Sequence, residues 1–338
     1  MRILRWLGPG GWAGLFVLLA VIPFLGLSRY YLTLMDQAMI FSIAVLGLYF
    51  VLGMTGQLSL AQAGFFGLGA YSAAILATHY GFPVWINIPI GIVVAVGFGI
   101  LLGIPSLKLS GHYLAMTTIG FGVILNLVYR NWRPVTGGTD GIPGIKPTYL
   151  GGLSLSHPGL FYYVIFTCLT VAAVVAWRVG RSRLGRAFNA IRENELAAEA
   201  VGVDSTRYKV IAFAMSAGYG GLAGALWTHF TRFIAPETFG FDTSVQMLAM
   251  LVIGGSTTVV GSIIGAFLLT FLPEVLRFLQ GSYIAVYGAG IIVLMVFLPE
   301  GIAGGLRLLI GRLTGQAAEA PRMLGQVGEV PDDAAAAG

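Results

Sequence analysis

Charged side chains are scarce in this sequence. Asp, Glu, Lys and Arg make up 10% of the 338 residues, whereas soluble proteins carry about 25%. Hydrophobic residues make up 57%, and the mean hydropathy is +0.85. A water-soluble fold of this composition would have more apolar surface than its core could bury, so the bilayer has to solvate much of the chain. The composition therefore predicts an integral membrane protein.

Cysteine and recognisable catalytic motifs are also nearly absent. Cys168 is the single cysteine, which excludes an internal disulfide, and a cysteine-based zinc site needs more ligands than one. The sequence contains no HExxH, no GxSxG and no zinc-ligand spacing. We therefore expect no catalytic residue, no metal site and no cofactor, and we expect no nucleic acid among the partners.

Ionisable side chains are nearly missing from the interior of the apolar runs. Asp36, Asp242 and Glu274 lie towards the ends of the runs in which they occur. Transporters driven by protons or voltage usually need such groups within the membrane. No phosphate-binding loop ending in GKS or GKT is present either. A secondary transporter and a lipid-modifying enzyme are thus weak alternatives, and the energy for any pumping has to come from another subunit.

Apolar runs long enough to cross a bilayer recur along the chain. A hydrocarbon core of about 30 Å requires about 20 helical residues. Such runs lie near 11–27, 32–54, 58–80, 84–104, 113–129, 160–177, 210–231, 242–256, 260–279 and 283–299. They predict an all-α fold, a polytopic transmembrane helical bundle of about ten spans. The run at 242–256 is short and ends at paired glycines, so a re-entrant or broken helix is the alternative there.

Basic residues orient the predicted bundle. Cytoplasmic connections carry an excess of Lys and Arg, and residues 178–209 hold seven of them, more than any other connection. Basic residues near both ends predict that both termini are cytoplasmic, which ten crossings satisfy. The first run could be a signal peptide, but no small-x-small cleavage pattern follows it, so we expect an uncleaved span. The same count puts the loop 131–158 outside.

Polar residues and glycines are concentrated where the third run begins. Residues 56–71 read GQLSLAQAGFFGLGAY. Gln57, Ser59 and Gln62 each need a hydrogen-bond partner if buried, and the glycines make a thin helix that can approach a neighbour or a solute path. We take these three polar residues as candidates for a solute pathway. Ordinary packing of small residues with polar caps is the alternative.

A glycine-rich turn lies in the predicted external loop. Residues 137–142 read GGTDGI. Such a turn can form a phosphate-binding nest, but an external turn that faces a partner or a solute is the better interpretation. Thr139 and Asp140 are therefore the remaining pathway candidates.

The basic segment 181–209 contains the pattern of a short amphipathic helix. Residues 186–201 place Ala, Ile and Val on a loose apolar face, with the charges elsewhere. Gly202 can end this helix, and Asp204 with Ser205 can cap the next one. The helix can lie on the membrane surface, tie two spans together or dock into a groove of a soluble partner. Its mixed acidic and basic side chains favour protein docking over lipid adhesion.

These motifs occur together, and in the same order, in a known family. The chain resembles the LivM-type permease subunits of branched-chain amino-acid ABC importers over about residues 30–305. The resemblance is carried by GQLSLAQAGFFGLGAYSAAI at 56–75, GGTDGI at 137–142, the segment at 183–217, GGSTTVVGSIIGA at 254–266 and LPEGI at 298–302.

The resemblance implies a transport subunit of the bacterial inner membrane and not an enzyme. The implied partners are a second permease subunit, two cytoplasmic ATP-binding subunits, a periplasmic solute-binding protein and the membrane lipid. Residues 1–312 would form one permease domain with 181–209 as its cytoplasmic coupling segment, and 313–338, rich in Ala, Gly and Pro, would be a disordered tail. The solute would be a branched-chain amino acid or a related small amide. The implied coupling residues are Arg186, Arg192, Glu193, Glu195, Ala198, Glu199 and Gly202.

Overall fold

The described part of the chain forms a bundle of helices. A computed structural model describes residues 28–106, 111–145, 149–150, 153–154, 158–277, 288 and 301–302. The predicted first span at 11–27, nearly all of the predicted last span at 283–299 and the predicted tail at 313–338 lie outside these residues.

The helices follow the predicted apolar runs closely. Each predicted run from 32–54 to 260–279 coincides with a helix. The all-α prediction is therefore confirmed for the described residues, apart from one short antiparallel pair of strands. In chain order the elements are α2 (Arg29–Leu48), the π-helix η3 (Tyr49–Met54), α3 (Gln62–His79), α4 (Val84–Ser106), α5 (His112–Asn131), α6 (Arg133–Thr136), η4 (Gly138–Asp140), β1 (Tyr149–Leu150), β2 (Leu153–Ser154), α7 (Pro158–Arg181), α8 (Arg183–Glu193), α9 (Glu195–Ala200), α10 (Ser205–Thr231), η5 (Pro236–Phe239), α11 (Phe241–Gly254) and α12 (Val259–Val275).

Within the described ranges, five helices are long and apolar enough to cross a membrane. They are α2 continued by η3, then α4, α5, α7 and α10, while α11 and α12 are apolar but shorter. Most of α3 is buried in the interior of the bundle. The fold is thus that of a multi-pass membrane protein, and the count of ten crossings stays a prediction.

Glycines let α3 and α10 touch backbone to backbone. A Cβ at Gly69 would lie 2.1 Å from the carbonyl oxygen of Gly221, and one at Gly224 would lie 1.9 Å from that of Phe66. No side chain fits at such distances, so these positions require glycine. Close approach of this kind is how helices associate in a bilayer, where lipid removes the hydrophobic drive for helices to pair.

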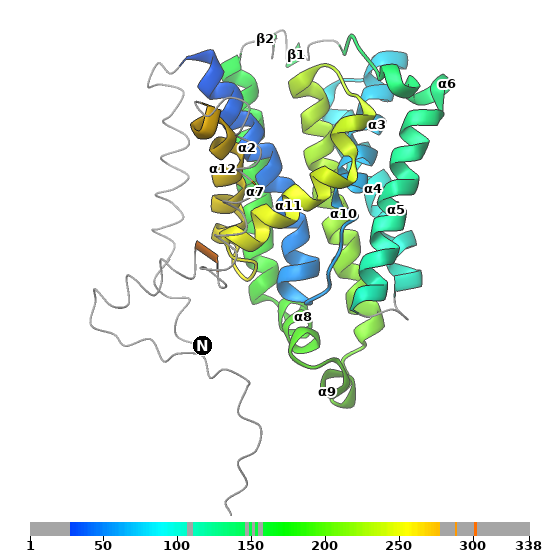
Figure 1. The fold of residues 1–338 in the computed structure, drawn as a ribbon, viewed down its shortest axis with the longest axis vertical. Coiled ribbons are helices and arrows are strands. Elements are labelled where there is room, and N and C mark those ends of the chain that lie inside the picture. The colour runs from blue at the N-terminus through cyan, green and yellow to red at the C-terminus, as the bar shows by residue number, and fades with distance from the viewer. Residues whose placement is uncertain are drawn as a thin grey trace, which may run out of the picture.

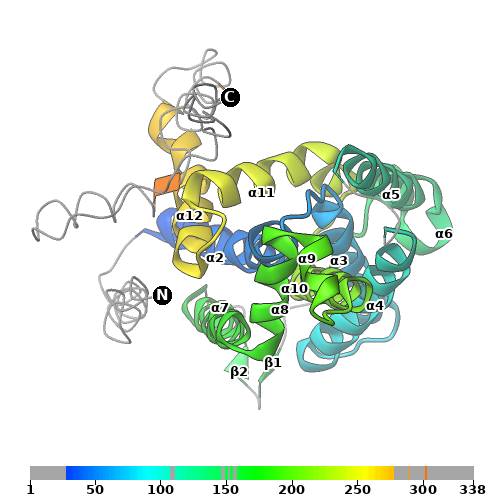
Figure 2. The same ribbon diagram turned by 90° about the horizontal axis from the view of Figure 1, so that it is seen from below.

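Two ends of the bundle carry different structures. Figure 1 shows α8 and α9 projecting at one end, while α6 and the β1–β2 hairpin lie at the opposite end. Seen from the α8–α9 end in Figure 2, these two helices lie over α10 and beside the end of α2. Helices α8 and α9 of the basic segment and the described residues of the loop 131–158 therefore lie at opposite ends, as the orientation predicted from the charges requires.

The pair α11 and α12 is held together by glycines. Figure 1 shows α11 running obliquely across α2 before the chain turns into α12. A Cβ at Gly254 would lie 1.9 Å from the carbonyl oxygen of Gly261, and one at Gly265 the same distance from that of Met250. With 14 residues, α11 would measure about 21 Å at the usual helical rise, which is less than a full hydrocarbon core.

Asp36 lies deeper in the bundle than the apolar run suggests. Because α2 begins at Arg29, Asp36 is about two turns into the helix. It is 4% exposed, and its Oδ1 has no hydrogen-bond partner among the described residues. A buried carboxyl group in a membrane helix is unusual, and its interior position was not predicted.

Candidate functional site

The coupling segment begins with an amphipathic helix, α8. Ser182 caps it by accepting a hydrogen bond from the Gly185 backbone N–H at 3.4 Å. Phe188 is fully buried and Ile191 is 5% exposed. Phe188 also meets the Tyr208 ring of α10 edge to face, with centroids 6.2 Å apart. The inner face of α8 is therefore anchored on the bundle, while Arg183, Arg186 and Glu193 are exposed.

A break at Asn194 corrects the prediction of one helix over 186–201. Asn194 has extended backbone angles, φ −161° and ψ 111°. Its side-chain oxygen accepts from the Ala197 N–H at 3.0 Å and so caps a second helix, α9. Asparagine competes for backbone hydrogen bonds and favours such caps over helix interiors. The segment therefore consists of two short helices, α8 and α9, with different directions.

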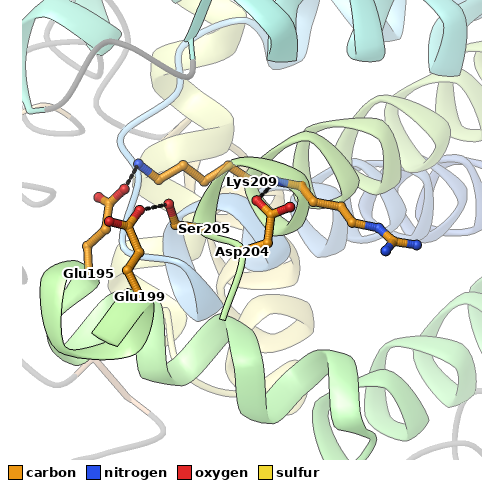
Figure 3. Close-up of polar contacts among 6 residues, drawn as sticks. Glu195, Glu199, Asp204, Ser205 and Lys209 are labelled. Carbon is orange, nitrogen blue, oxygen red and sulfur yellow. Dashed lines mark hydrogen bonds and ion pairs between the residues drawn. The ribbon is translucent and has the colours of Figure 1, made fainter. Parts of the chain in front are cut away.

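Polar contacts fix α9 to the start of α10, as Figure 3 shows. The Lys209 ammonium group forms an ion pair with Glu195, and the Ser205 hydroxyl donates to Glu199. The Lys209 side chain is 6% exposed and that of Glu195 38%. A buried ammonium group is costly unless it is paired, so Lys209 holds α9 in place.

A tight turn then leads from α9 into α10. Gly202 has φ +88°, a conformation that glycine adopts without strain, and its N–H donates to the Glu199 carbonyl at 2.9 Å. The Asp204 side chain accepts from the Arg207 N–H at 2.9 Å and caps α10. The sequence predicted both the turn and this cap.

The outer surface of α9 exposes two apolar side chains. Leu196 is 78% exposed and Val201 is 79% exposed. Ala198, by contrast, faces inward and is 3% exposed. Ala197 and Ala200 are exposed as well, so the tip presents apolar side chains beside its charged ones, as surfaces that bind other proteins often do. Leu196 and Val201 were not among the predicted coupling residues.

The predicted coupling residues divide into three groups. Glu195, Ala198, Glu199 and Gly202 shape α9 and its junction with α10. Arg186 and Glu193 are exposed on α8. Arg192 is exposed as a residue, but its Nη1 donates to the Gly53 carbonyl at the end of η3, at 2.6 Å. Lys209 and Ser205, which hold the segment, were missed because they lie in the next helix.

Gln62 occupies a structural position. It is 1% exposed. Its amide nitrogen donates to the Ala44 carbonyl at 2.7 Å, and its amide oxygen accepts from the Ser216 hydroxyl at 2.8 Å. Gln62 thus joins α2, α3 and α10 through groups that are already satisfied.

Gln57 and Ser59 lie in an extended stretch between η3 and α3. Residues 56–61 alternate between exposed and buried positions, and both polar side chains point inward. The buried Oε1 of Gln57 has no hydrogen-bond partner among the described residues. A shallow hollow borders this stretch at Leu60, lined by residues of α3, α5, η5 and the start of α11, both small ones and the larger Ile119, Phe239 and Phe241. Extended backbone inside a membrane protein is tolerated where it is buried or lines a cavity.

Thr139 and Asp140 lie far from the other pathway candidates. Both are exposed at the opposite end of the bundle from α9. Asp140 faces Arg133 at 3.9 Å, with both side chains largely in solvent. A Cβ at Gly141 would lie 2.1 Å from the Ile234 carbonyl oxygen, so the turn is held tightly against residue 234. The five pathway candidates therefore do not form one site.

Long apolar helices, a non-helical stretch between η3 and α3 in their midst and a polar segment at one end define the class, a multi-pass membrane permease. The chain matches the family described as "Branched-chain amino acid transport system / permease component" over residues 30–299 and belongs to it. Such a subunit is a transport component and not an enzyme. The prediction from the sequence motifs is confirmed.

Curated relatives agree with this assignment. The high-affinity branched-chain amino acid transport system permease protein LivM of Salmonella typhimurium is 33% identical over 326 residues, which cover 90% of this chain and 76% of the relative. LivM of Escherichia coli is 34% identical over 311 residues, covering 85% and 73%. The autoinducer 2 import system permease protein LsrC of Yersinia pestis is 28% identical over 305 residues, covering 85% and 82%. No solved structure matches the chain.

Proposed function

We propose that this chain is the LivM-like subunit of an ATP-driven importer that moves branched-chain amino acids across the bacterial inner membrane. It works with a second permease subunit, two cytoplasmic ATP-binding subunits and a periplasmic solute-binding protein. The names of the two LivM relatives support the solute class. The observation that carries the mechanism is the rigid α8–α9 segment with Leu196 and Val201 at its tip.

Docking of an ATP-binding subunit explains the outer surface of this segment. Two apolar side chains at a tip can enter a groove, and the charged groups around them, including Arg186 and Glu193, can fix the orientation. The inner surface of the segment binds it to the rest of this chain. The Lys209–Glu195 pair and the contact of Glu199 with Ser205 make α9 and α10 move together. Movement at the tip then reaches the core, where α10 lies against α3.

The stretch 56–61 is the best candidate for the solute path. It carries buried Gln57 and Ser59, and the Gln57 Oε1 is a buried acceptor that has no partner in the described part of the chain. Such a break can change its path more easily than a continuous helix can, because fewer backbone hydrogen bonds hold it. Thr139 and Asp140 lie at the opposite end and suit contact with the solute-binding protein that delivers the cargo.

The proposed orientation places α8 and α9 in the cytoplasm and the loop 131–158 outside. The seven basic residues of 178–209 support it. The turn after α11 lies beside Gly53, at the α8 end of the bundle. The chain therefore reaches that end although α11 alone is shorter than a hydrocarbon core, and this supports counting the eighth run as a crossing. We accordingly propose ten crossings within a single permease domain, 1–312, with both termini cytoplasmic.

The docking proposal is tested by charge at the tip. Leu196→Asp combined with Val201→Asp should abolish co-purification of the ATP-binding subunits, because both carboxylates would be desolvated in the groove. Leu196→Met, which keeps an apolar side chain of similar volume, should assemble normally. The readouts are subunit stoichiometry and uptake of leucine, isoleucine, valine and urea into proteoliposomes containing the whole complex. Unchanged assembly of the double variant would contradict the proposal, and preferential urea uptake would contradict the solute class.

A further inference from the structure

Three segments that are far apart in the sequence meet at Gly53. Arg192 of α8 donates to the Gly53 carbonyl at 2.6 Å. A Cβ on Gly53 would lie 2.1 Å from the carbonyl oxygen of Ser256, in the turn between α11 and α12. Gly53 itself belongs to η3, the π-helix that ends α2. The coupling segment, the end of α2 and the α11–α12 turn are therefore in direct contact at one residue.

The Gly53 carbonyl needs a partner from outside its own helix. The last carbonyls of a helix have no intrahelical donor. The chain that follows satisfies two of them, since Gln57 N–H donates to Val51 at 2.9 Å and Gly56 N–H to Leu52 at 3.1 Å. The Gly53 carbonyl instead accepts a hydrogen bond from the Arg192 guanidinium. A positive charge is favourable at a helix C-terminus.

The absence of a side chain at Gly56 lets the aliphatic part of Arg192 pack against the non-helical stretch between η3 and α3. The Gly56 φ of +72° lies in the left-handed region, and a Cβ there would lie 3.1 Å from Arg192 Cγ. Both observations disfavour any larger residue. The Arg192 side chain thus touches the last turn of η3 and the first residue of the stretch 56–61. Single π-helical turns are rare and frequently mark functional sites.

Neighbouring arginines of α8 make no comparable contact among the described residues. Arg186 reaches only the Arg181 carbonyl, at 3.5 Å, and stays on the surface. Arg183 is exposed at the start of the helix. Arg192 is therefore the basic residue of α8 that is placed to act on the membrane-embedded part.

We infer that Arg192 is a positioning residue that transmits movement of the coupling segment to the α2–α3 break and to the α11–α12 turn. The inference rests on the proposed coupling role of segment 181–209. When α8 moves with a bound ATP-binding subunit, the guanidinium draws the Gly53 carbonyl with it. Ser256 follows because its backbone touches Gly53. The stretch 56–61 then shifts between two positions, and the solute path opens or closes.

The test uses the complete transporter in liposomes, with its ATP-binding subunits and binding protein. Arg192→Ala removes the contact, and Arg192→Lys keeps one cationic donor. Arg178→Gln removes an exposed arginine at the end of α7, outside the coupling segment, and is the matched control. A thiol at the 38% exposed position Leu58, introduced as Leu58→Cys with Cys168→Ala, reports on the break through its labelling rate with and without ATP.

We expect Arg192→Ala complexes to assemble and to bind ATP, while the labelling rate at position 58 no longer depends on the nucleotide. Transport per complex should fall by roughly tenfold, the effect of losing one hydrogen bond from a charged donor. Arg192→Lys should recover part of both signals, and Arg178→Gln should match the parent. A merely structural role would reduce the amount of complex but leave labelling of the remaining complexes dependent on the nucleotide.

Two results would overturn the inference. One is nucleotide-dependent labelling that survives in Arg192→Ala, and the other is labelling that does not respond to nucleotide in the parent. If Leu196→Asp with Val201→Asp still loses the ATP-binding subunits in either case, the proposed function stands and only the relay fails. If that variant assembles normally, the proposed coupling role fails as well.

Discussion

Gln62 shows how a single polar side chain can join three membrane helices. Its side-chain amide forms hydrogen bonds with Ala44 of α2 and Ser216 of α10, and both lie inside the bundle. We expect Gln62→Met to lower the free energy of unfolding by about 1–3 kcal/mol, since several buried groups lose partners. Unfolding in detergent micelles, followed by circular dichroism, measures this. The KM for solute should stay unchanged in the surviving complexes, and a raised KM would instead place Gln62 on the pathway.

Single residues were predictable where local chemistry decides their role. Gly202 and Asp204 act through their own backbone neighbourhood, so the turn and the cap could be predicted from adjacent residues. Lys209 and Arg192 act through partners 14 and 139 positions away. The choice of such partners depends on how the helices are arranged, and no local pattern specifies it. The inward role of Arg192 therefore appeared only in the structure.

At the scale of elements, the α3–α10 contact depends on glycine. We expect Gly224→Ala to destabilise the bundle by about 1–3 kcal/mol, because the added methyl group would meet the Phe66 carbonyl oxygen and overpack the contact. Gly97→Ala is the matched control, since nothing lies within 4 Å of a Cβ there. It should be neutral or stabilise α4 by up to about 1 kcal/mol. Thermal unfolding of the two variants measures this difference in stability. Equal stability of Gly224→Ala and Gly97→Ala would contradict the close contact.

Helix existence was easier to predict than helix breaks. Long apolar runs located every described helix from α2 to α12 that is embedded in the bundle, because the bilayer imposes length and composition directly. The split at Asn194 was missed, since Ala-rich residues on both sides fit one continuous helix and only the side-chain cap shows two. The π-helical end of α2 was not predicted, because residues 49–54 are as apolar as those before them.

On the scale of the whole molecule, the proposed function assigns a different partner to each end of the bundle. The α8–α9 tip offers apolar side chains on a rigid mount, and the 137–142 turn offers exposed Thr139 and Asp140. At the α8 end of the bundle, η3 at the end of α2 and the α11–α12 turn meet at Gly53, where Arg192 also binds. A subunit that uses the energy of ATP at one end to release cargo received at the other needs such a connection through the membrane.

This arrangement predicts the sidedness of three surface positions. In a Cys168→Ala background, a membrane-impermeant thiol reagent added to intact spheroplasts should label Asp140→Cys. It should label Leu196→Cys and Thr257→Cys only after permeabilisation, since Thr257 is exposed in the turn beside the Gly53–Arg192 contact. Labelling of Thr257→Cys from outside would mean that α11 does not complete a crossing, so ten spans would be wrong. External labelling of Leu196→Cys would mean that the bundle has the opposite orientation. Cytoplasmic ATP-binding subunits could then not bind α9.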